Sequence, residues 1–150
     1  MSWSAWIPVA RFLDSGWNHD PEVPCALGVY RFRVNEDHKG PHAGKVVYVG
    51  MSNAQSTTIC QRVGNFISAA MGFYTQHSGG NTFYNRTGTS QEHGLNVRDL
   101  EVSWSVDDCP PCAETEEYRR YSPPPMFNQG VPKPCGQPTC QRSRNLLAKG

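Results

Sequence analysis

The sequence predicts a small α+β domain with a three-stranded antiparallel sheet flanked by helices. Three kinds of pattern support this fold class: valine- and aromatic-rich runs bounded by turn residues, one strictly alternating run, and segments with helical periodicity. Along the 150-residue chain they follow the order strand, strand, helix, strand, helix. We expect an N-terminal arm at 1–25, the main domain at 26–130 and a cysteine-containing C-terminal tail at 131–150.

The first two strands are expected at 26–34 and 45–50, which are rich in valine and aromatic residues. The residues between them include Asn35 and Gly44, which favour turns. Two strands joined by such a loop form a hairpin. Before the hairpin, residues 1–24 hold three of the four tryptophans, and we expect a short helix or an extended arm that packs on the domain.

A helix is predicted over 58–71, because Thr58 follows a segment rich in N-cap residues and Gly72 can end the helix. Its apolar residues recur with the helical period and form one buried face: Ile59, Val63, Phe66, Ile67 and Ala70. Residues 72–98 are rich in Gly, Ser, Thr and Asn and predict a long loop. Within it, the Phe-Tyr-Asn-Arg sequence at 83–86 is equally consistent with a partner contact and with a local hydrophobic anchor.

Residues 99–106 alternate strictly between apolar and polar side chains, which predicts a half-buried strand. Asp107 and Asp108 can cap a following helix, and the prolines at 110 and 111 suit its first turn. This helix is expected to run to about Tyr121, shortly before three consecutive prolines. The tail is rich in Pro, Gly and Gln and is expected to be irregular apart from a last turn at 145–148.

The formal net charge of +1 predicts only modest charge-driven binding to nucleic acid, apart from local basic clusters such as Arg31 and Arg33. No apolar run approaches the length that spans a membrane, and the N-terminus lacks the pattern of a secretory signal. We therefore expect a soluble intracellular protein of the cytoplasm, nucleoid or nucleus. In that setting the six cysteines are expected to be thiols or metal ligands rather than disulfides.

Two tripeptides lie in the predicted hairpin, Gly-Val-Tyr at 28–30 and Tyr-Val-Gly at 48–50. Together they resemble the signature of the GIY-YIG nuclease family, with valine in each half where isoleucine is usual. The resemblance covers roughly residues 26–130, and the family core has the same order of strands and helices. It implies a divalent-metal-dependent DNA endonuclease of the restriction, repair or mobile-element type, which hydrolyses phosphodiester bonds with Mg²⁺ or Mn²⁺.

The resemblance implies a role for each candidate catalytic residue. Arg62, twelve positions after the second tripeptide, corresponds to the family arginine that holds the scissile phosphate. Glu114, on the helix after the third strand, corresponds to the metal-binding glutamate, with Glu116 as the alternative. Tyr30 is the expected general base, and Tyr48 is expected to orient the attacking water or to contact phosphate.

Other positions are expected to support the site or to contact DNA. Gly28 and Gly50 allow close approach of another group to the backbone. Asn128 corresponds to the late asparagine that braces the site in the family. The expected DNA contacts are Arg31, Arg33 and Arg86.

The chain departs from the family at one position. Many relatives carry a histidine one helical turn after the arginine, where this chain has Phe66. Either His77 or His93 takes the place of that histidine, or Tyr30 acts without one.

Four of the cysteines form two pairs along the chain, Cys109 with Cys112 and Cys135 with Cys140. Four thiolates at this spacing can hold a tetrahedral Zn²⁺ that ties the glutamate helix to the tail. A Cys-Pro-Pro-Cys sequence at a helix start is also typical of thiol-disulfide oxidoreductases, and ordinary reduced cysteines are a third interpretation. For the whole domain, the alternative to a nuclease is a nucleic-acid-binding module of the same fold without catalysis.

Overall fold

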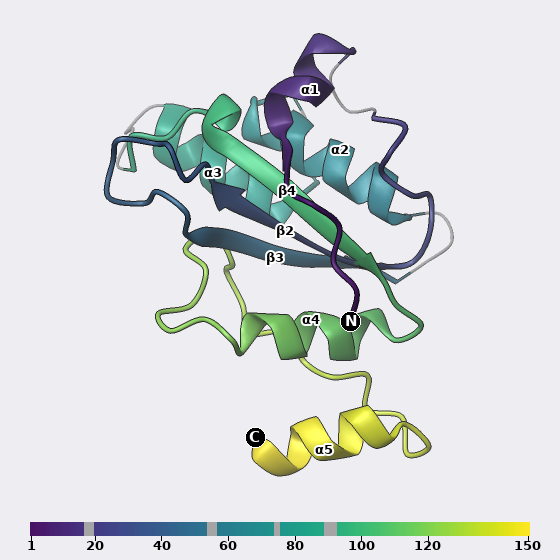
Figure 1. The fold of residues 1–150 in the computed structure, drawn as a ribbon. Helices are drawn as coiled ribbons and strands as arrows, with labels where there is room; N and C mark the ends of the chain where they lie inside the picture. The colour runs from purple at the N-terminus through teal and green to yellow at the C-terminus, as the bar shows by residue number, and fades with distance from the viewer. Residues whose placement is uncertain (17–19, 54–56, 74–75, 89–92) are drawn as a thin grey trace.

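The computed structural model contains an antiparallel sheet that lies between helices on its two faces (Figure 1). This α+β architecture confirms the predicted fold class, whereas the sheet has four strands rather than the three expected. The structure describes residues 1–16, 20–53, 57–73, 76–88 and 93–150, and at 86–88 it describes the backbone alone.

The four strands are antiparallel to their neighbours and follow the order β1-β4-β2-β3 across the sheet. Their bounds are β1 Ile7–Pro8, β2 Gly28–Val34, β3 Val46–Ser52 and β4 Leu100–Val106. The additional strand β1 pairs with β4, where Ile7 lies opposite Val102. Proline fits this strand because the strand forms an edge of the sheet. A two-residue strand is too short to show a period of two, which is why the sequence pattern did not reveal it.

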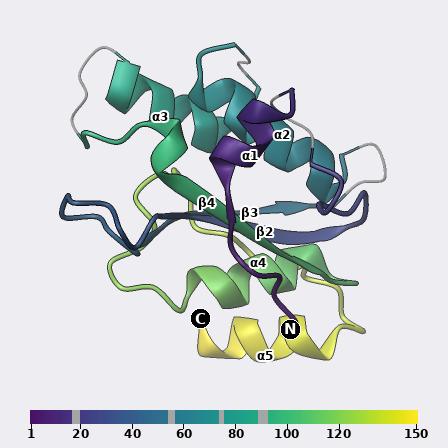
Figure 2. The ribbon, with the colours of Figure 1, turned by 45° about the horizontal axis from the view of Figure 1, so that its top comes forward.

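Helices cover both faces of the sheet, and α4 lies between the sheet and α5 (Figure 1 and Figure 2). On the opposite face, α1, α2 and α3 lie together. The bounds of the helices are α1 Val9–Asp14, α2 Ile59–Ala70, α3 Ser78–Gly88, α4 Pro110–Tyr118 and α5 Gln141–Lys149. A short 3₁₀ helix, η1 Val97–Asp99, leads into β4.

The main hydrophobic core lies between the sheet and α2. Phe32 of β2 stacks on Phe66 of α2, with ring centroids 3.9 Å apart. Thr58 begins α2 through a capping box, in which its backbone N–H donates to Gln61 Oε1 at 2.9 Å. Each end of α2 therefore lies within one residue of the predicted helix at 58–71.

Two helices lie where we expected irregular chain. α3 occupies part of the predicted loop at 72–98, although its sequence contains residues of low helix propensity. A Cβ at Gly80 would lie 2.5 Å from the Phe66 carbonyl oxygen, so glycine is needed for α3 to approach α2 this closely. Packing against α2 therefore outweighs local propensity. In the tail, α5 extends well beyond the expected turn at 145–148.

The aromatic pair in α3 divides between the core and the surface. Phe83 is buried, and its ring centroid lies 5.0 Å from that of Phe127. Tyr84 is exposed. Phe83 is thus a hydrophobic anchor rather than a partner contact, while the side chain of Arg86 lies outside the described part of the chain.

The sheet face beneath α4 buries an ion pair as well as apolar side chains. Val29 and Val49 pack against Ala113 of α4. Beside them, the Arg31 guanidinium donates to Glu117 Oε2 at 2.8 Å, and the Glu117 side chain is fully buried. Both faces of the central strands are therefore covered, and α4 is held to the sheet by charge as well as by packing.

The structure corrects the expectation that the cysteines avoid disulfides. Cys25, before β2, and Cys60, in the first turn of α2, form a disulfide. Their Cα atoms lie 5.1 Å apart, within the range that a disulfide requires. The bond ties the start of α2 to the segment that enters β2. Cys60 lies two residues before Arg62. The other four cysteines are not disulfide-bonded.

Candidate active site and four-cysteine metal site

Two buried tyrosines from neighbouring strands lie side by side. The ring centroids of Tyr30 in β2 and Tyr48 in β3 are 6.1 Å apart. Gly50 lies opposite Tyr30 in the strand register, and a Cβ at Gly50 would come within 2.6 Å of the Tyr30 hydroxyl oxygen. A Cβ at Gly28 would lie 2.2 Å from the Ser105 carbonyl oxygen. Close packing therefore requires glycine in both tripeptides.

His77, just before α3, forms a hydrogen bond with the first of these tyrosines. Its Nε2 lies 2.8 Å from the Tyr30 hydroxyl oxygen, and the Gly80 N–H donates to its Nδ1 at 3.2 Å. Because Nδ1 is an acceptor, a neutral imidazole carries its proton on Nε2, and this N–H points at the Tyr30 oxygen. Burial, assisted by the charge of Arg62, lowers the pKa of His77 to about 3, so the ring is neutral at physiological pH.

His77 and His93 are the two candidates for the histidine that Phe66 replaces, and His77 is the one that lies beside the tyrosines. The His77 ring packs edge-on against Phe66, with centroids 5.4 Å apart. His93 instead packs against Phe83 and Phe127, at centroid distances of 4.9 and 5.0 Å. Phe66 therefore packs against the imidazole of His77, which lies immediately before α3.

Arg62 of α2 and Glu114 of α4 bring opposite charges to the tyrosine pair. Burial raises the pKa of Tyr30 well above its usual value, and the neighbouring Tyr48 raises it further. Arg62 opposes this rise through its charge and a hydrogen bond, whereas the charge of Glu114 adds to it. Burial, together with the charge of Glu114, raises the pKa of Tyr48 to about 12.

The carboxyl group of Glu114 is itself perturbed. Burial raises the pKa of Glu114 to about 7, and the Arg62 guanidinium only partly offsets the rise. Arg62 and Glu114 thus act on the same tyrosines, although their helices lie on opposite faces of the sheet. We refer to five side chains, which are linked by ring contacts or by their effects on one another's pKa values, as the tyrosine cluster: Tyr30, Tyr48, Arg62, His77 and Glu114.

The three glutamates of α4 have different surroundings. Glu114 belongs to the tyrosine cluster. Glu116 accepts a hydrogen bond of 2.7 Å from Arg142 of α5. Glu117 is buried in its ion pair with Arg31 of β2. Among these three side chains, the charge of Glu114 is the one that acts on both tyrosines, which favours it over Glu116 as the metal-binding candidate.

Asn128 braces the edge strand β3 from the loop after α4. Its Oδ1 accepts the Val49 N–H at 3.0 Å, and its Nδ2 donates to the Val49 carbonyl oxygen at 2.9 Å. The preceding residue, Phe127, donates its N–H to the Val47 carbonyl oxygen at 2.9 Å. These bonds occupy backbone groups of an edge strand, where no further strand is available. They hold the backbone on either side of Tyr48.

The expected DNA contacts in β2 are engaged within the fold. Arg31 pairs with Glu117, and its guanidinium carbon lies 3.9 Å from the ring centroid of Trp3. Arg33 donates to Glu101 at 2.9 Å. Since intramolecular partners hold both guanidinium groups, the structure does not support these two arginines as a phosphate-binding patch.

The tyrosine cluster combines groups that can act on a phosphate ester. Arg62 offers a permanent positive charge with planar donors, and Glu114 offers oxygen ligands for a hard cation. The raised pKa of Tyr30 means that its phenol is protonated in the metal-free protein. A tyrosine that acts as a base needs a lowered pKa. Arg62 does lower the pKa of Tyr30, but burial raises it by more.

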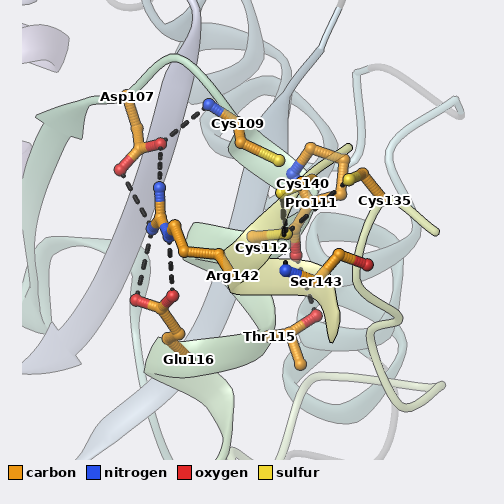
Figure 3. A network of polar contacts seen from close by, with 10 residues as sticks. All are labelled: Asp107, Cys109, Pro111, Cys112, Thr115, Glu116, Cys135, Cys140, Arg142 and Ser143. Carbon is orange, nitrogen blue, oxygen red and sulfur yellow. Dashed lines mark hydrogen bonds and ion pairs between the residues drawn. The ribbon is translucent and has the colours of Figure 1, made fainter. Parts of the chain in front are cut away.

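Four cysteine sulfur atoms meet between α4 and the tail (Figure 3). The Sγ atoms of the group lie within 4.8 Å of one another, an arrangement that could hold a metal ion. Cys112 Sγ is 3.8 Å from the Sγ atoms of both Cys135 and Cys140. We refer to this set as the four-cysteine group: Cys109, Cys112, Cys135 and Cys140.

Local structure at both ends of the group holds the cysteines in position. The Cys109 N–H donates to Asp107 Oδ1 at 2.8 Å, immediately before α4. Cys140 precedes α5, and its Sγ accepts the Ser143 N–H at 3.4 Å. Gly136 has a φ of +74°, in the left-handed region that favours glycine, and it turns the chain between the two cysteines of the second pair.

Arg142 of α5 bridges two acidic residues beside the four-cysteine group (Figure 3). Its Nη1 donates to Asp107 Oδ1 and its Nε to Glu116 Oε1, each at 2.7 Å. Its Nη2 donates to the second oxygen of each carboxylate at 3.2 Å. One guanidinium therefore joins α5 both to α4 and to the segment after β4.

No protein-family model, curated protein or solved structure matches the chain. Within the described ranges, no helix has both the length and the apolar character needed to cross a bilayer. Function is therefore inferred from the tyrosine cluster and the four-cysteine group themselves.

Proposed function

We propose that the chain is a DNA endonuclease of the GIY-YIG type, which hydrolyses phosphodiester bonds with Mg²⁺ or Mn²⁺. The observation that carries the proposal is the convergence of the tyrosine cluster. The tripeptide resemblance selects residues from distant parts of the sequence, and these residues influence one another's pKa values in the folded chain. Such mutually perturbed groups are typical of functional sites.

Glu114 suits a hard divalent cation. Its raised pKa, about 7, means that Arg62 alone does not balance its negative charge in this partly buried position. Mg²⁺ and Mn²⁺ take oxygen ligands and retain several waters, so one carboxylate is a sufficient protein ligand. The bound ion supplies Lewis-acid stabilisation of the charge that develops on the phosphate and on the leaving 3′ oxygen.

Arg62 binds the scissile phosphate in this proposal. Its guanidinium can donate to two phosphate oxygens at once and stays charged throughout the reaction. Arg62 and Glu114 lie near the same two tyrosines, so the phosphate and its metal would meet beside the Tyr30 hydroxyl. Cleavage by in-line attack of water leaves a 5′ phosphate and a 3′ hydroxyl.

In this proposal Tyr30 takes the proton of the attacking water, and His77 positions the Tyr30 oxygen. The His77 Nε2–H points at the Tyr30 oxygen, and Arg62 lowers the pKa of the same group. Both contacts favour the tyrosinate form, but burial outweighs them in the metal-free chain, so the proposal requires a bound cation to lower the pKa of Tyr30 further. Once the Tyr30 proton has passed to solvent, the tyrosinate would accept a proton from the attacking water. Tyr48 orients this water or contacts the phosphate.

At the four-cysteine group we propose Zn²⁺, the ion typically held by four thiolates. A thiol-disulfide function has less support. Burial raises the pKa of Cys109 and raises that of Cys112 to about 12, whereas a reactive thiol needs a lowered pKa.

Nicking of supercoiled plasmid tests the nuclease proposal. Wild-type protein with Mg²⁺ or Mn²⁺ is expected to nick the plasmid, and Arg62→Ala to lose about 10²–10³-fold in rate, as when a transition-state donor is removed. Glu116→Gln, a control on α4 that keeps an acceptor oxygen for Arg142, is expected to retain cutting. A wild-type protein that binds DNA but cuts no plasmid, oligonucleotide or branched substrate would instead identify a non-catalytic binding module.

A further inference from the structure

We infer that the four-cysteine group is a structural zinc site which, together with Arg142, fastens the C-terminal segment 131–150 to α4. The distances between the sulfur atoms support this directly. With a Zn–S bond of about 2.3 Å, the sulfurs of a tetrahedral site lie about 3.8 Å apart. Cys112 Sγ lies at 3.8 Å from two of its partners, and the whole group fits within 4.8 Å.

Ser143 holds Cys140 and the loop between Cys135 and Cys140 in place. The Ser143 N–H donates to Cys140 Sγ at 3.4 Å, and the Ser143 hydroxyl accepts the Gly136 N–H at 2.9 Å. The first bond favours the thiolate form of Cys140, and the second fixes the turn at Gly136 between the two cysteines. They also explain why Ser143, a polar residue of an outer helix, is fully buried.

The C-terminal segment has little apolar packing of its own. Within the nine residues of α5, only Ser143 and Leu146 are buried. Val131 and Leu147 are exposed, at 68% and 58%. Ordering a proline- and glycine-rich segment costs conformational entropy that this small apolar contact does not offset. A metal cross-link and the contacts of Arg142 supply the missing attachment.

The same attachment fixes the backbone that carries Glu114. Cys109 immediately precedes α4 and Cys112 lies in its first turn, two residues before Glu114. Arg142 holds Glu116 on the outer side of α4. The consequence for Glu114 rests on the proposed nuclease function, whereas the zinc site is independent of it.

Metal analysis of the purified full chain is the first test. We expect about one zinc per chain, and we expect Co²⁺ substitution to give the strong visible and charge-transfer bands of tetrahedral thiolate ligation. Cys112→Ser should lose the metal, while the matched Cys25→Ser/Cys60→Ser variant should retain it. Metal-free protein with four titratable thiols, or a Cys109–Cys112 disulfide found by mass spectrometry, overturns the zinc site.

Amide hydrogen exchange of the full chain, before and after zinc removal by a chelator, tests the attachment. Amides of α5, and the Ala113 N–H of α4, which donates to the Cys109 carbonyl oxygen, are expected to exchange at least about tenfold faster without zinc. Arg142→Ala should keep the zinc but accelerate exchange in α5. Unchanged exchange after complete zinc removal overturns the attachment, and plasmid nicking, measured separately, tests only the nuclease proposal.

Discussion

Stability in acid should depend on His77, because its imidazole is buried and neutral in the folded chain. Burial holds the pKa of His77 at about 3, against 6.5 in the unfolded chain. The unfolded state therefore binds the extra proton first, so the stabilising contribution of His77 is complete above about pH 6.5 and is lost as pH falls toward 3. At about pH 5 the loss is about 2 kcal/mol, from 1.36 kcal/mol per pKa unit.

Chemical denaturation of wild type and His77→Gln over about pH 5–7 measures this loss. Glutamine can still accept from Gly80 and donate to Tyr30, but it does not titrate. The wild type should lose about 2 kcal/mol more than the variant between the two ends of the range. Parallel curves for the two proteins would refute the reasoning, as would a His77 pKa near 6.5 measured by NMR on the wild type, which needs no variant.

Three further substitutions or treatments have expected outcomes. Glu114→Gln should stabilise the metal-free fold by about 1–2 kcal/mol at pH 8, because burial makes the ionised carboxylate unfavourable and raises the pKa of Glu114 to about 7, while partial exposure reduces this cost. Below pH 4 the carboxyl group is protonated, so the variant and the wild type should be equally stable. Urea denaturation at both pH values checks this. Gly79→Ala should destabilise the fold by about 1–3 kcal/mol, since its Cβ would meet the Tyr48 ring at 2.2 Å, and Gly130→Ala, with open space around it, is the control in thermal melts. Reducing Cys25–Cys60, which closes a 35-residue separation, should cost about 3–4 kcal/mol, and equal denaturation midpoints with and without reductant would contradict this.

Local patterns were sufficient to predict the central strands and α2. The helical period and N-cap signal placed α2 to within one residue, because both signals lie inside the helix itself. Arg62 and Glu114 were instead selected by the family resemblance, and their roles in a site stay predictions. The charges of both residues do act on the pKa values of Tyr30 and Tyr48.

Features that depend on tertiary packing could not be predicted from local patterns. The sequence left His77 and His93 as alternatives, because neither shares a helical or strand period with Tyr30. His77 reaches Tyr30 because Gly80 lets α3 lie close against α2. The disulfide likewise joins residues 35 positions apart. Arg31 and Arg33 alternate along β2 as on a basic surface strand, but Arg31 forms an ion pair with the buried Glu117 of α4. In each case the partner comes from an element distant in sequence, and one chain's periodicity carries no signal for such pairs.

The most direct test of the central claim, that the tyrosine cluster is a nuclease active site, is the initial rate of plasmid nicking with Mn²⁺ by wild type, Glu114→Gln and Glu116→Gln. The two variants make the same chemical change two residues apart on α4, but only Glu114 acts on both tyrosines. We expect metal-dependent nicking by wild type, a loss of about 10²-fold or more in Glu114→Gln, and near wild-type rates in Glu116→Gln. Equal rates in the two variants, or no cutting by wild type, would contradict the claim.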